Sequence, residues 1–198
     1  MNRPQQSRAL DAEFVLEAYT AGFFPMADPR TGEISWYSPD PRAVLPLDKF
    51  HVPRSLNIVL RRQVFEVRVD TSFGEVIRSC SAREETWISE EVRDVFLSLH
   101  RIGFAHSIET WHSGRLAGGL YGLSIRGAFF GESMFSLVPN ASKVALAHLV
   151  GHLTRRKFRL LDVQFMTRHL AMFGAVEIPR SSYMKILTRA LSSRSTFS

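Results

Sequence analysis

The 198-residue chain has almost no cysteine: Cys80 is the single one. One thiol excludes a disulfide within the chain and any metal site built from several cysteines, so we expect a reducing compartment, the cytoplasm. Cys80 lies between polar residues in "IRSCSARE", where nothing nearby indicates an activated thiol. The sequence therefore gives it no nucleophilic role.

Long apolar runs are also missing. No uninterrupted apolar stretch approaches the ~20 residues that span a bilayer, and the opening "MNRPQQSRAL" lacks the apolar segment of a signal peptide. The hydrophobic fraction of 45% still supplies a sizeable core. We predict a soluble protein with no membrane partner, and we expect a monomer.

Acidic residues are in deficit, with 19 Asp and Glu against 25 Lys and Arg, which gives a net charge of +6. This balance favours a polyanionic partner such as RNA, an anionic membrane surface or an acidic ligand. Arg155, Arg156, Lys157 and Arg159 form a basic run that either complements a helix dipole or, with Arg42, Arg61 and Arg62, binds phosphates.

Metal and cofactor signatures are absent as well. His148 and His152 lie four residues apart, but no glutamate follows the first and no third ligand is near, so we predict no metal. The nearest match to a coenzyme A pyrophosphate loop, "RLAGGL" at 115–120, ends in leucine inside an expected strand. We predict no cofactor.

The order of elements indicates an α+β fold. Residues 105–136 contain two turn signals between three apolar-rich segments, which predicts an antiparallel three-stranded meander. A helix after residue 140, a strand at 160–165, a helix near 167–174, a strand near 175–180 and a closing helix follow. A meander followed by helix, strand, helix and strand is typical of a GNAT-like acyltransferase domain.

The N-terminal part has a different pattern. Helical spacing from Asp11 ends at Gly22, and residues 23–48 contain many prolines and no sustained period, which indicates a loop-rich connector. We predict a small N-terminal subdomain at 1–38 and the GNAT-like domain at 39–198.

Polar side chains interrupt two apolar segments. Asp162 and Gln164 alternate with apolar residues in "LLDVQF" and so share one strand face, either as a buried hydrogen-bonded pair or as a catalytic pair. Glu132 in "GESMFS" needs a partner if it is buried, since an unpaired carboxylate costs several kcal/mol. That partner is an arginine of the protein or a cation of a substrate.

Seven segments in fixed order resemble the leucyl/phenylalanyl-tRNA–protein transferases, bacterial enzymes that move an amino acid from tRNA to a protein N-terminus. The resemblance runs from about Ala18 to Tyr183, and it departs from the family at Met26 in "FPM" and Val163 in "DVQ". The segments are "WYSPDPRAVLPLD", "TWISEEV", "AHSIETW", "GESMFS", "NASK", "DVQ" and "GAVEIPR".

This resemblance implies a GNAT-like domain that transfers Leu or Phe, less readily Met, from aminoacyl-tRNA to acceptor proteins beginning with Arg or Lys, and so marks them for degradation. It implies that Asp162 and Gln164 are catalytic and that Glu132 binds the acceptor's cationic side chain or the donor's ammonium. It places the aminoacyl side chain in a pocket of Leu120, Phe129, Leu146, Leu153 and Leu161. The tRNA 3′ end is expected on Trp36, Tyr37 and Trp87, and its phosphates on Arg42, Arg155, Arg156 and Lys157.

Two other functions remain open from the residues. An acetyl-CoA-dependent acetyltransferase would bind coenzyme A, which the missing loop disfavours. A non-catalytic RNA-binding protein would retain tRNA affinity without any transfer.

Overall fold

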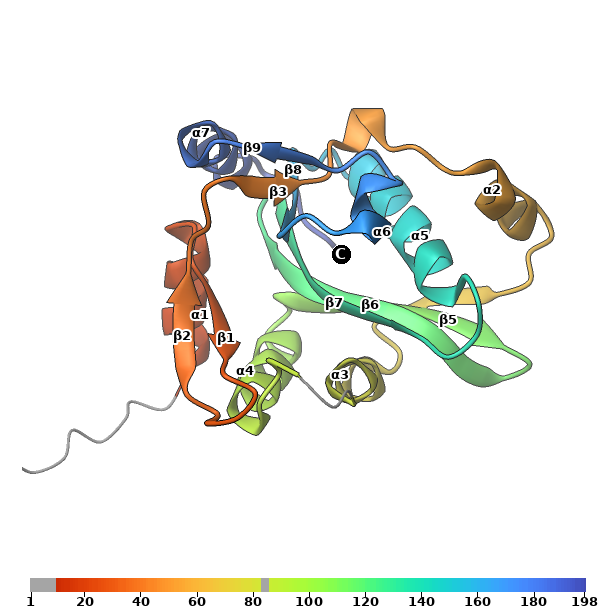
Figure 1. Ribbon diagram of the computed structural model, residues 1–198, viewed down its shortest axis with the longest axis horizontal. Helices are drawn as coiled ribbons and strands as arrows, with labels where there is room; N and C mark the ends of the chain where they lie inside the picture. Colours follow the sequence, from red (N-terminus) through yellow and green to blue (C-terminus); the bar gives the residue numbers. More distant parts are fainter. Residues whose placement is uncertain (1–9, 83–85) are drawn as a thin grey trace, which may run out of the picture.

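The central element is a mixed β-sheet with the strand order β4-β5-β6-β7-β8-β3-β9. The computed structural model describes residues 10–82 and 86–198 (Figure 1). The strands are β3 (Arg42–Val44), β4 (Glu66–Val69), β5 (Ala105–His112), β6 (Arg115–Ile125), β7 (Ala128–Ser136), β8 (Leu160–Gln164) and β9 (Val176–Ile178). All neighbours pair antiparallel except β7 and β8, which are parallel.

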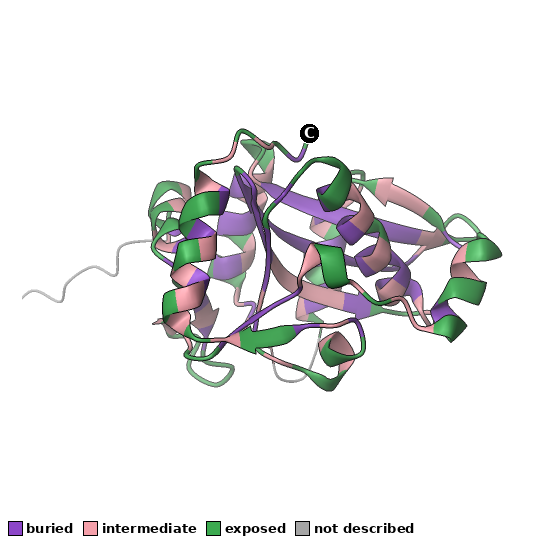
Figure 2. Ribbon diagram, turned by 90° about the horizontal axis from the view of Figure 1, so that it is seen from above, coloured by how far each residue is buried: buried purple, intermediate pink, exposed green. Residues whose placement is uncertain are grey.

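Helices cover both faces of this sheet. The helices are α1 (Ala12–Thr20), α2 (Arg54–Arg61), α3 (Phe73–Ser81), α4 (Glu90–Arg101), α5 (Ala141–Arg155), α6 (Arg168–Ala171) and α7 (Arg180–Leu191), with a 3-10 turn at Leu47–Lys49. One core cluster lies under α1, α3, α4 and α7, and a second lies under α2 and α5. Figure 2 shows the buried residues concentrated in the sheet and on the inner faces of the helices.

The predicted meander is confirmed as β5, β6 and β7, and the helix, strand, helix, strand and helix after it are α5, β8, α6, β9 and α7. The crossover helix α5 makes the parallel pairing of β7 with β8 possible, because parallel neighbours need a long connection. The α+β class of the prediction is therefore confirmed.

The prediction of a loop-rich connector at 23–48 was wrong. This stretch forms a two-stranded ribbon, β1 (Phe24–Ala27) with β2 (Ile34–Tyr37), and then β3, which inserts between β8 and β9. Strands of three or four residues are too short to show a period of two, and β3 owes its place to partners far away in the sequence. Residues 10–38 also share a core with the rest of the chain, since Tyr19 and Phe24 pack with α4 and α7.

Candidate active site

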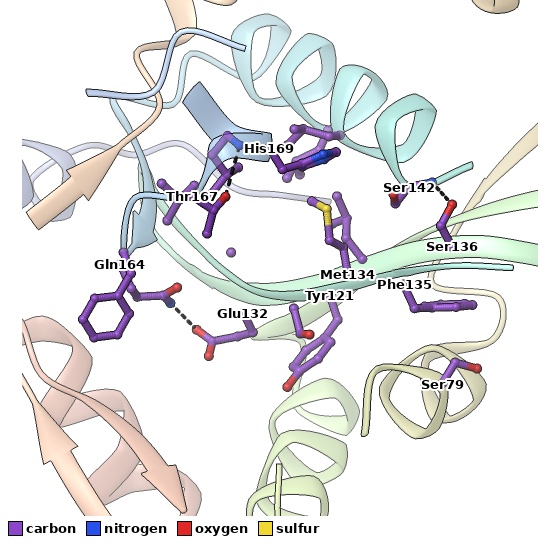
Figure 3. A pocket seen from close by; sticks show the side chains of 18 of the residues that line it. Ser79, Tyr121, Glu132, Met134, Phe135, Ser136, Ser142, Gln164, Thr167 and His169 are labelled. Carbon is purple, nitrogen blue, oxygen red and sulfur yellow. Dashed lines mark hydrogen bonds between the residues drawn. The ribbon is translucent and has the colours of Figure 1, made fainter. Parts of the chain in front are cut away.

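A cavity of about 800 Å³ opens where β7 and β8 stop pairing. Their register runs from Ala128 and Leu160 to Phe130 and Asp162. Two residues further along each strand, Glu132 and Gln164 line the cavity (Figure 3). The lining comes from the core clusters on both faces of the sheet, so the cavity reaches through the sheet at this gap.

Glu132 lies at a bulge in β7. Tyr121 pairs with Ser133 and Gly122 pairs with Gly131, so Glu132 is an extra residue with no direct partner on β6. Bulges bend a strand and re-aim its side chains, and they are common beside active sites.

The Glu132 carboxyl has two hydrogen bonds and no ion pair among the described residues. Its Oε1 accepts from the Tyr19 hydroxyl at 2.8 Å and from Gln164 Nε2 at 3.1 Å. Its Oε2 is buried and has no hydrogen-bond partner in the described chain. Burial raises the pKa of Glu132 to about 8, although the Tyr19 hydrogen bond acts in the opposite direction.

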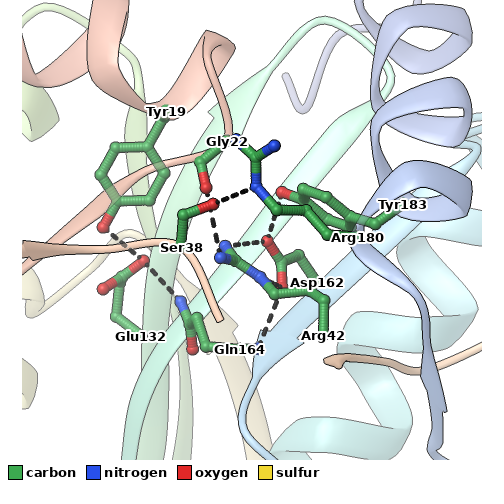
Figure 4. A network of polar contacts seen from close by, with 9 residues as sticks. All are labelled: Tyr19, Gly22, Ser38, Arg42, Glu132, Asp162, Gln164, Arg180 and Tyr183. Carbon is green, nitrogen blue, oxygen red and sulfur yellow. Dashed lines mark hydrogen bonds and ion pairs between the residues drawn. The ribbon is translucent and has the colours of Figure 1, made fainter. Parts of the chain in front are cut away.

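Asp162 is buried and fully paired. Its two oxygens accept from Nε and Nη2 of Arg42 at 3.0 and 2.7 Å, and Oδ2 also accepts from the Tyr183 hydroxyl at 2.7 Å (Figure 4). The Arg42 guanidinium lies between the Phe24 and Tyr183 rings, 4.5 and 4.7 Å from their centroids. Such a bidentate pair fixes the carboxylate in place.

This environment corrects the prediction that Arg42 binds tRNA phosphate. Its side chain is 1% exposed, and its Nη1 also donates to the carbonyl of Gly22 at 3.3 Å. A guanidinium committed to Asp162 and Gly22 inside the core is not accessible to a phosphate on the surface.

Gln164 has a strained backbone. Its φ is +57°, and Phe165 N donates to Val163 O at 2.7 Å across it, which makes a γ-turn directly after β8. Asp162 Oδ1 accepts from Gln164 N at 2.9 Å and so stabilises this turn. Left-handed conformations of residues other than glycine cost ~1–3 kcal/mol and cluster at functional sites.

Five apolar residues were predicted for the aminoacyl pocket, and three of them, Leu120, Leu146 and Leu161, line the cavity. Within the described chain, Phe129 and Leu153 are buried but do not line it. Phe129 instead stacks on Phe197, with ring centroids 5.4 Å apart. The sequence prediction missed further apolar lining residues, Met134, Leu149, Val163 and Leu170.

The three aromatic residues predicted for the tRNA end are separated. Trp87 lines the cavity next to Phe24 and Met26. Tyr37 is exposed and stacks on Phe24 at 6.1 Å, outside the cavity. Trp36 packs edge-on against Phe14 at 5.1 Å, so its ring is partly used by the N-terminal packing.

The basic residues Arg155, Arg156 and Lys157 are exposed at the end of α5. His152 lies near them, and its Nε2 is 2.8 Å from the carbonyl oxygen of Phe197. The described residues contain no group of three His, Cys, Asp or Glu placed to hold a metal ion. Within the same residues, no helix has the length and apolar character needed to cross a membrane.

Nothing in the sequence pointed to three tyrosines of the site. Tyr19 and Tyr183 are at helical positions typical of core residues, and only the fold brings their hydroxyls to Glu132 and Asp162. Tyr121 also lines the cavity, with its hydroxyl buried and without a hydrogen-bond partner in the described chain. A fully buried tyrosine hydroxyl without a partner is uncommon and marks a polar spot in the wall.

Comparison with known proteins identifies the family. Residues 44–188 match the model for leucyl/phenylalanyl-tRNA protein transferase, and residues 8–40 match the model for the N-terminal domain of the same family. A curated relative from Chlorobaculum tepidum, named leucyl/phenylalanyl-tRNA–protein transferase, is 53% identical over 192 residues, which are 95% of this chain and 99% of the relative. Another of that name, from Rubrobacter xylanophilus, is 55% identical over 183 residues, 92% of this chain and 95% of the relative.

A solved structure, L-PGS from Bacillus licheniformis, has a TM-score of 0.44 and 12% identity, and the match covers 89% of this chain and 62% of that one. Similarity at this level says nothing firm about the fold, whereas the sequence matches extend over nearly the whole chain. The chain belongs to the leucyl/phenylalanyl-tRNA–protein transferase family.

Proposed function

We propose that the protein transfers Leu or Phe, and less readily Met, from aminoacyl-tRNA to the α-amino group of proteins with N-terminal Arg or Lys, which marks them for degradation. The observation that carries this proposal is the family match along the chain, and the cavity beside Gln164 agrees with it. We further propose that residues 39–198 form a GNAT-like domain with a small subdomain at 1–38, and that the protein acts as a cytoplasmic monomer.

The reaction needs alignment more than activation. The donor is an activated ester, and an α-amine with a pKa of about 7.7–8.0 is partly neutral near neutral pH. The amine attacks the ester carbonyl, the new C–N bond forms, and the ester bond to the ribose oxygen breaks as that oxygen takes a proton. Correct orientation alone can remove roughly 7–11 kcal/mol of the barrier.

We assign the catalytic roles to Gln164 and Asp162. The amide oxygen of Gln164 accepts a hydrogen bond from the attacking amine and so directs the lone pair of the amine at the carbonyl. Asp162 acts on Gln164 through its backbone, since its carboxylate bonds Gln164 N. The predicted contact of Glu132 with a cation of either substrate stays a prediction.

The apolar wall of Leu120, Leu146 and Leu161 receives the donor side chain. Apolar pockets discriminate a methylene by only ~1–3 kcal/mol, which agrees with tolerance among Leu, Phe and Met. We place the tRNA 3′ end on Trp87, because stacking on aromatic rings accepts any base, and contacts with Trp36 and Tyr37 outside the cavity stay a prediction. The phosphates lie along Arg155, Arg156 and Lys157.

The test is transfer of radiolabelled Leu from charged tRNA to peptides that differ only in the first residue: Arg, Lys, Asp or Ala. We expect transfer to the Arg and Lys peptides alone and its loss in Gln164→Ala. Transfer to none of the peptides, with tRNA binding intact, would replace the proposal by a non-catalytic RNA-binding function.

A further inference from the structure

The amide of Gln164 has two ends of nearly the same shape and opposite hydrogen-bonding character. Only its oxygen can accept a hydrogen bond from an amine, so the reaction needs the oxygen, not the nitrogen, to face the substrate. We infer that Glu132 is the positioning residue that sets this orientation, with Tyr19 holding Glu132 in turn. The inference rests on the proposed function and assigns the residues that prepare Gln164 for it.

The donor and acceptor inventory fixes the direction. Glu132 Oε1 is an acceptor, since the Tyr19 hydroxyl donates to it at 2.8 Å, and Gln164 Nε2 donates to the same oxygen at 3.1 Å. The amide oxygen lies beside this nitrogen and faces the cavity in Figure 3. A proton on Oε2 leaves this arrangement intact, since Oε1 still accepts.

Asp162 does not perform this task. Its oxygens bond Arg42, Tyr183 and the backbone nitrogen of Gln164. The two carboxyl groups therefore divide the positioning: Asp162 fixes the strained backbone of Gln164, and Glu132 fixes its side chain. The hydrogen bond between Asp162 and Gln164 therefore runs through the backbone of Gln164 and leaves its side chain to Glu132.

Glu132 is itself held from several elements. The bulge in β7 aims its side chain, and the Tyr19 hydroxyl from α1 donates to the same Oε1 at 2.8 Å. Tyr19 is fully buried, with its ring edge-on to Phe130 at 5.0 Å. Because Tyr19 belongs to the first 38 residues, the N-terminal part of the chain contributes directly to the orientation of Gln164.

The groups that influence the charge of Glu132 come from every element around it. Tyr19 on α1, Tyr121 on β6, Arg42 on β3, and Asp162 and Gln164 on β8 all interact with it. The single guanidinium among them is already paired with Asp162. Glu132 therefore titrates near pH 8 in the free protein, and Gln164 reports that change through its hydrogen bond.

The test combines side-chain amide NMR with steady-state transfer kinetics. The NH₂ resonances of Gln164, assigned by their loss in Gln164→Ala, are followed against pH in ¹⁵N-labelled protein. We expect them to shift with a midpoint of about 8 in the wild type and to lose this titration in Glu132→Gln. Glu177→Gln, the same change on the exposed strand β9, should leave the titration in place.

In transfer assays, Glu132→Gln lets the Gln164 amide take either orientation, because a second amide both donates and accepts. We expect kcat to fall roughly 100-fold, the loss typical of ~1 Å of misplacement, with unchanged KM for the acceptor and unchanged preference for Arg over Ala. Tyr19→Phe removes one hydrogen bond to Glu132 and should lower kcat by less than Glu132→Gln does. The KM for the acceptor and the preference for Arg should again be unchanged.

Two results would overturn the inference. Unchanged Gln164 resonances in Glu132→Gln would show that Glu132 does not hold the amide. A raised KM and a lost preference for Arg, with kcat retained, would show that Glu132 binds a substrate cation instead. If the wild type transfers nothing, the proposed function fails. The NMR titration still shows whether Glu132 holds the Gln164 amide.

Discussion

Two carboxyl groups of the same cavity region have opposite surroundings. Asp162 has a bidentate guanidinium and a tyrosine hydroxyl, whereas Glu132 has two neutral donors and no cation among the described residues. The sequence indicated both as polar residues in apolar strands, but it did not indicate their partners. Arg42 and Tyr19 are more than a hundred residues away along the chain, and only the fold selects them.

The buried pair between Arg42 and Asp162 should stabilise the protein strongly. Both side chains are at most 1% exposed, so Arg42→Met leaves a buried carboxylate without its cation. We expect the free energy of unfolding, from urea denaturation, to fall by ~3–5 kcal/mol. Arg93→Met breaks an exposed pair with Glu90 and should cost at most about 1 kcal/mol. Equal effects of the two substitutions would contradict this assignment.

Glu132 should make stability depend on pH. Its pKa is raised from 4.5 to about 8 in the folded state, so between these values the folded protein holds a proton that the unfolded chain has lost. The wild type should lose stability relative to Glu132→Gln as pH rises through this window, by at most roughly 1.4 kcal/mol per pH unit. Denaturation curves of the two proteins that run parallel across the window would exclude the raised pKa.

At the scale of elements, the sequence predicted the long strands and helices from residue 105 onward, because each carries a clear period or turn signal. It missed β1, β2 and β3, whose shortness hides any period. The family resemblance also placed Leu153 in the pocket together with Leu146, which lies on the same apolar stripe of α5. A stripe identifies the buried face of a helix, but it does not show which turn of that helix meets a cavity.

Leu146 lines the cavity and Leu153, on the same helix α5, does not, so only Leu146 should affect which donor amino acid is transferred. Leu146→Ala enlarges the cavity and should raise the ratio of Phe to Leu transfer at least roughly tenfold. Leu153→Ala should cost ~2–5 kcal/mol of stability and leave the ratio unchanged, because Leu153 is buried away from the cavity. Transfer from the two charged tRNAs in competition measures the ratio. A shift in Leu153→Ala equal to that in Leu146→Ala would place the pocket elsewhere.

At the scale of the whole molecule, the charge of +6 favoured an anionic partner without choosing between RNA, a membrane surface and an acidic ligand, and the motifs indicated the family. The sequence could not show that the cavity reaches through the sheet or that Phe24 and Met26, from the N-terminal part of the chain, share its wall. Both features depend on the gap between β7 and β8 and on contacts between distant segments. The excess positive charge lies on the surface. Its contribution to binding a polyanion is measured from the dependence of the binding constant on salt concentration.

The exposed run at the end of α5 should contribute to tRNA binding through counterion release. Replacing Arg155, Arg156 and Lys157 by Ala should flatten the slope of log K against log salt by about 2–3, at 0.7–0.9 per phosphate contact. Arg101→Ala removes an exposed cation at the end of α4, over the other face of the sheet, and should leave the slope unchanged. If the slope of log K against log salt is the same in the triple variant as in the wild type, these three residues do not contact the tRNA phosphates.

The role of Gln164 is tested most directly by a single-turnover measurement of Leu transfer from charged tRNA to an Arg peptide, with wild type and Gln164→Ala. We expect rapid transfer in the wild type and a loss of rate in the variant with tRNA affinity unchanged, because Gln164 orients the amine and does not bind the tRNA. An undiminished rate in Gln164→Ala would contradict the assignment of the active site to the gap between β7 and β8.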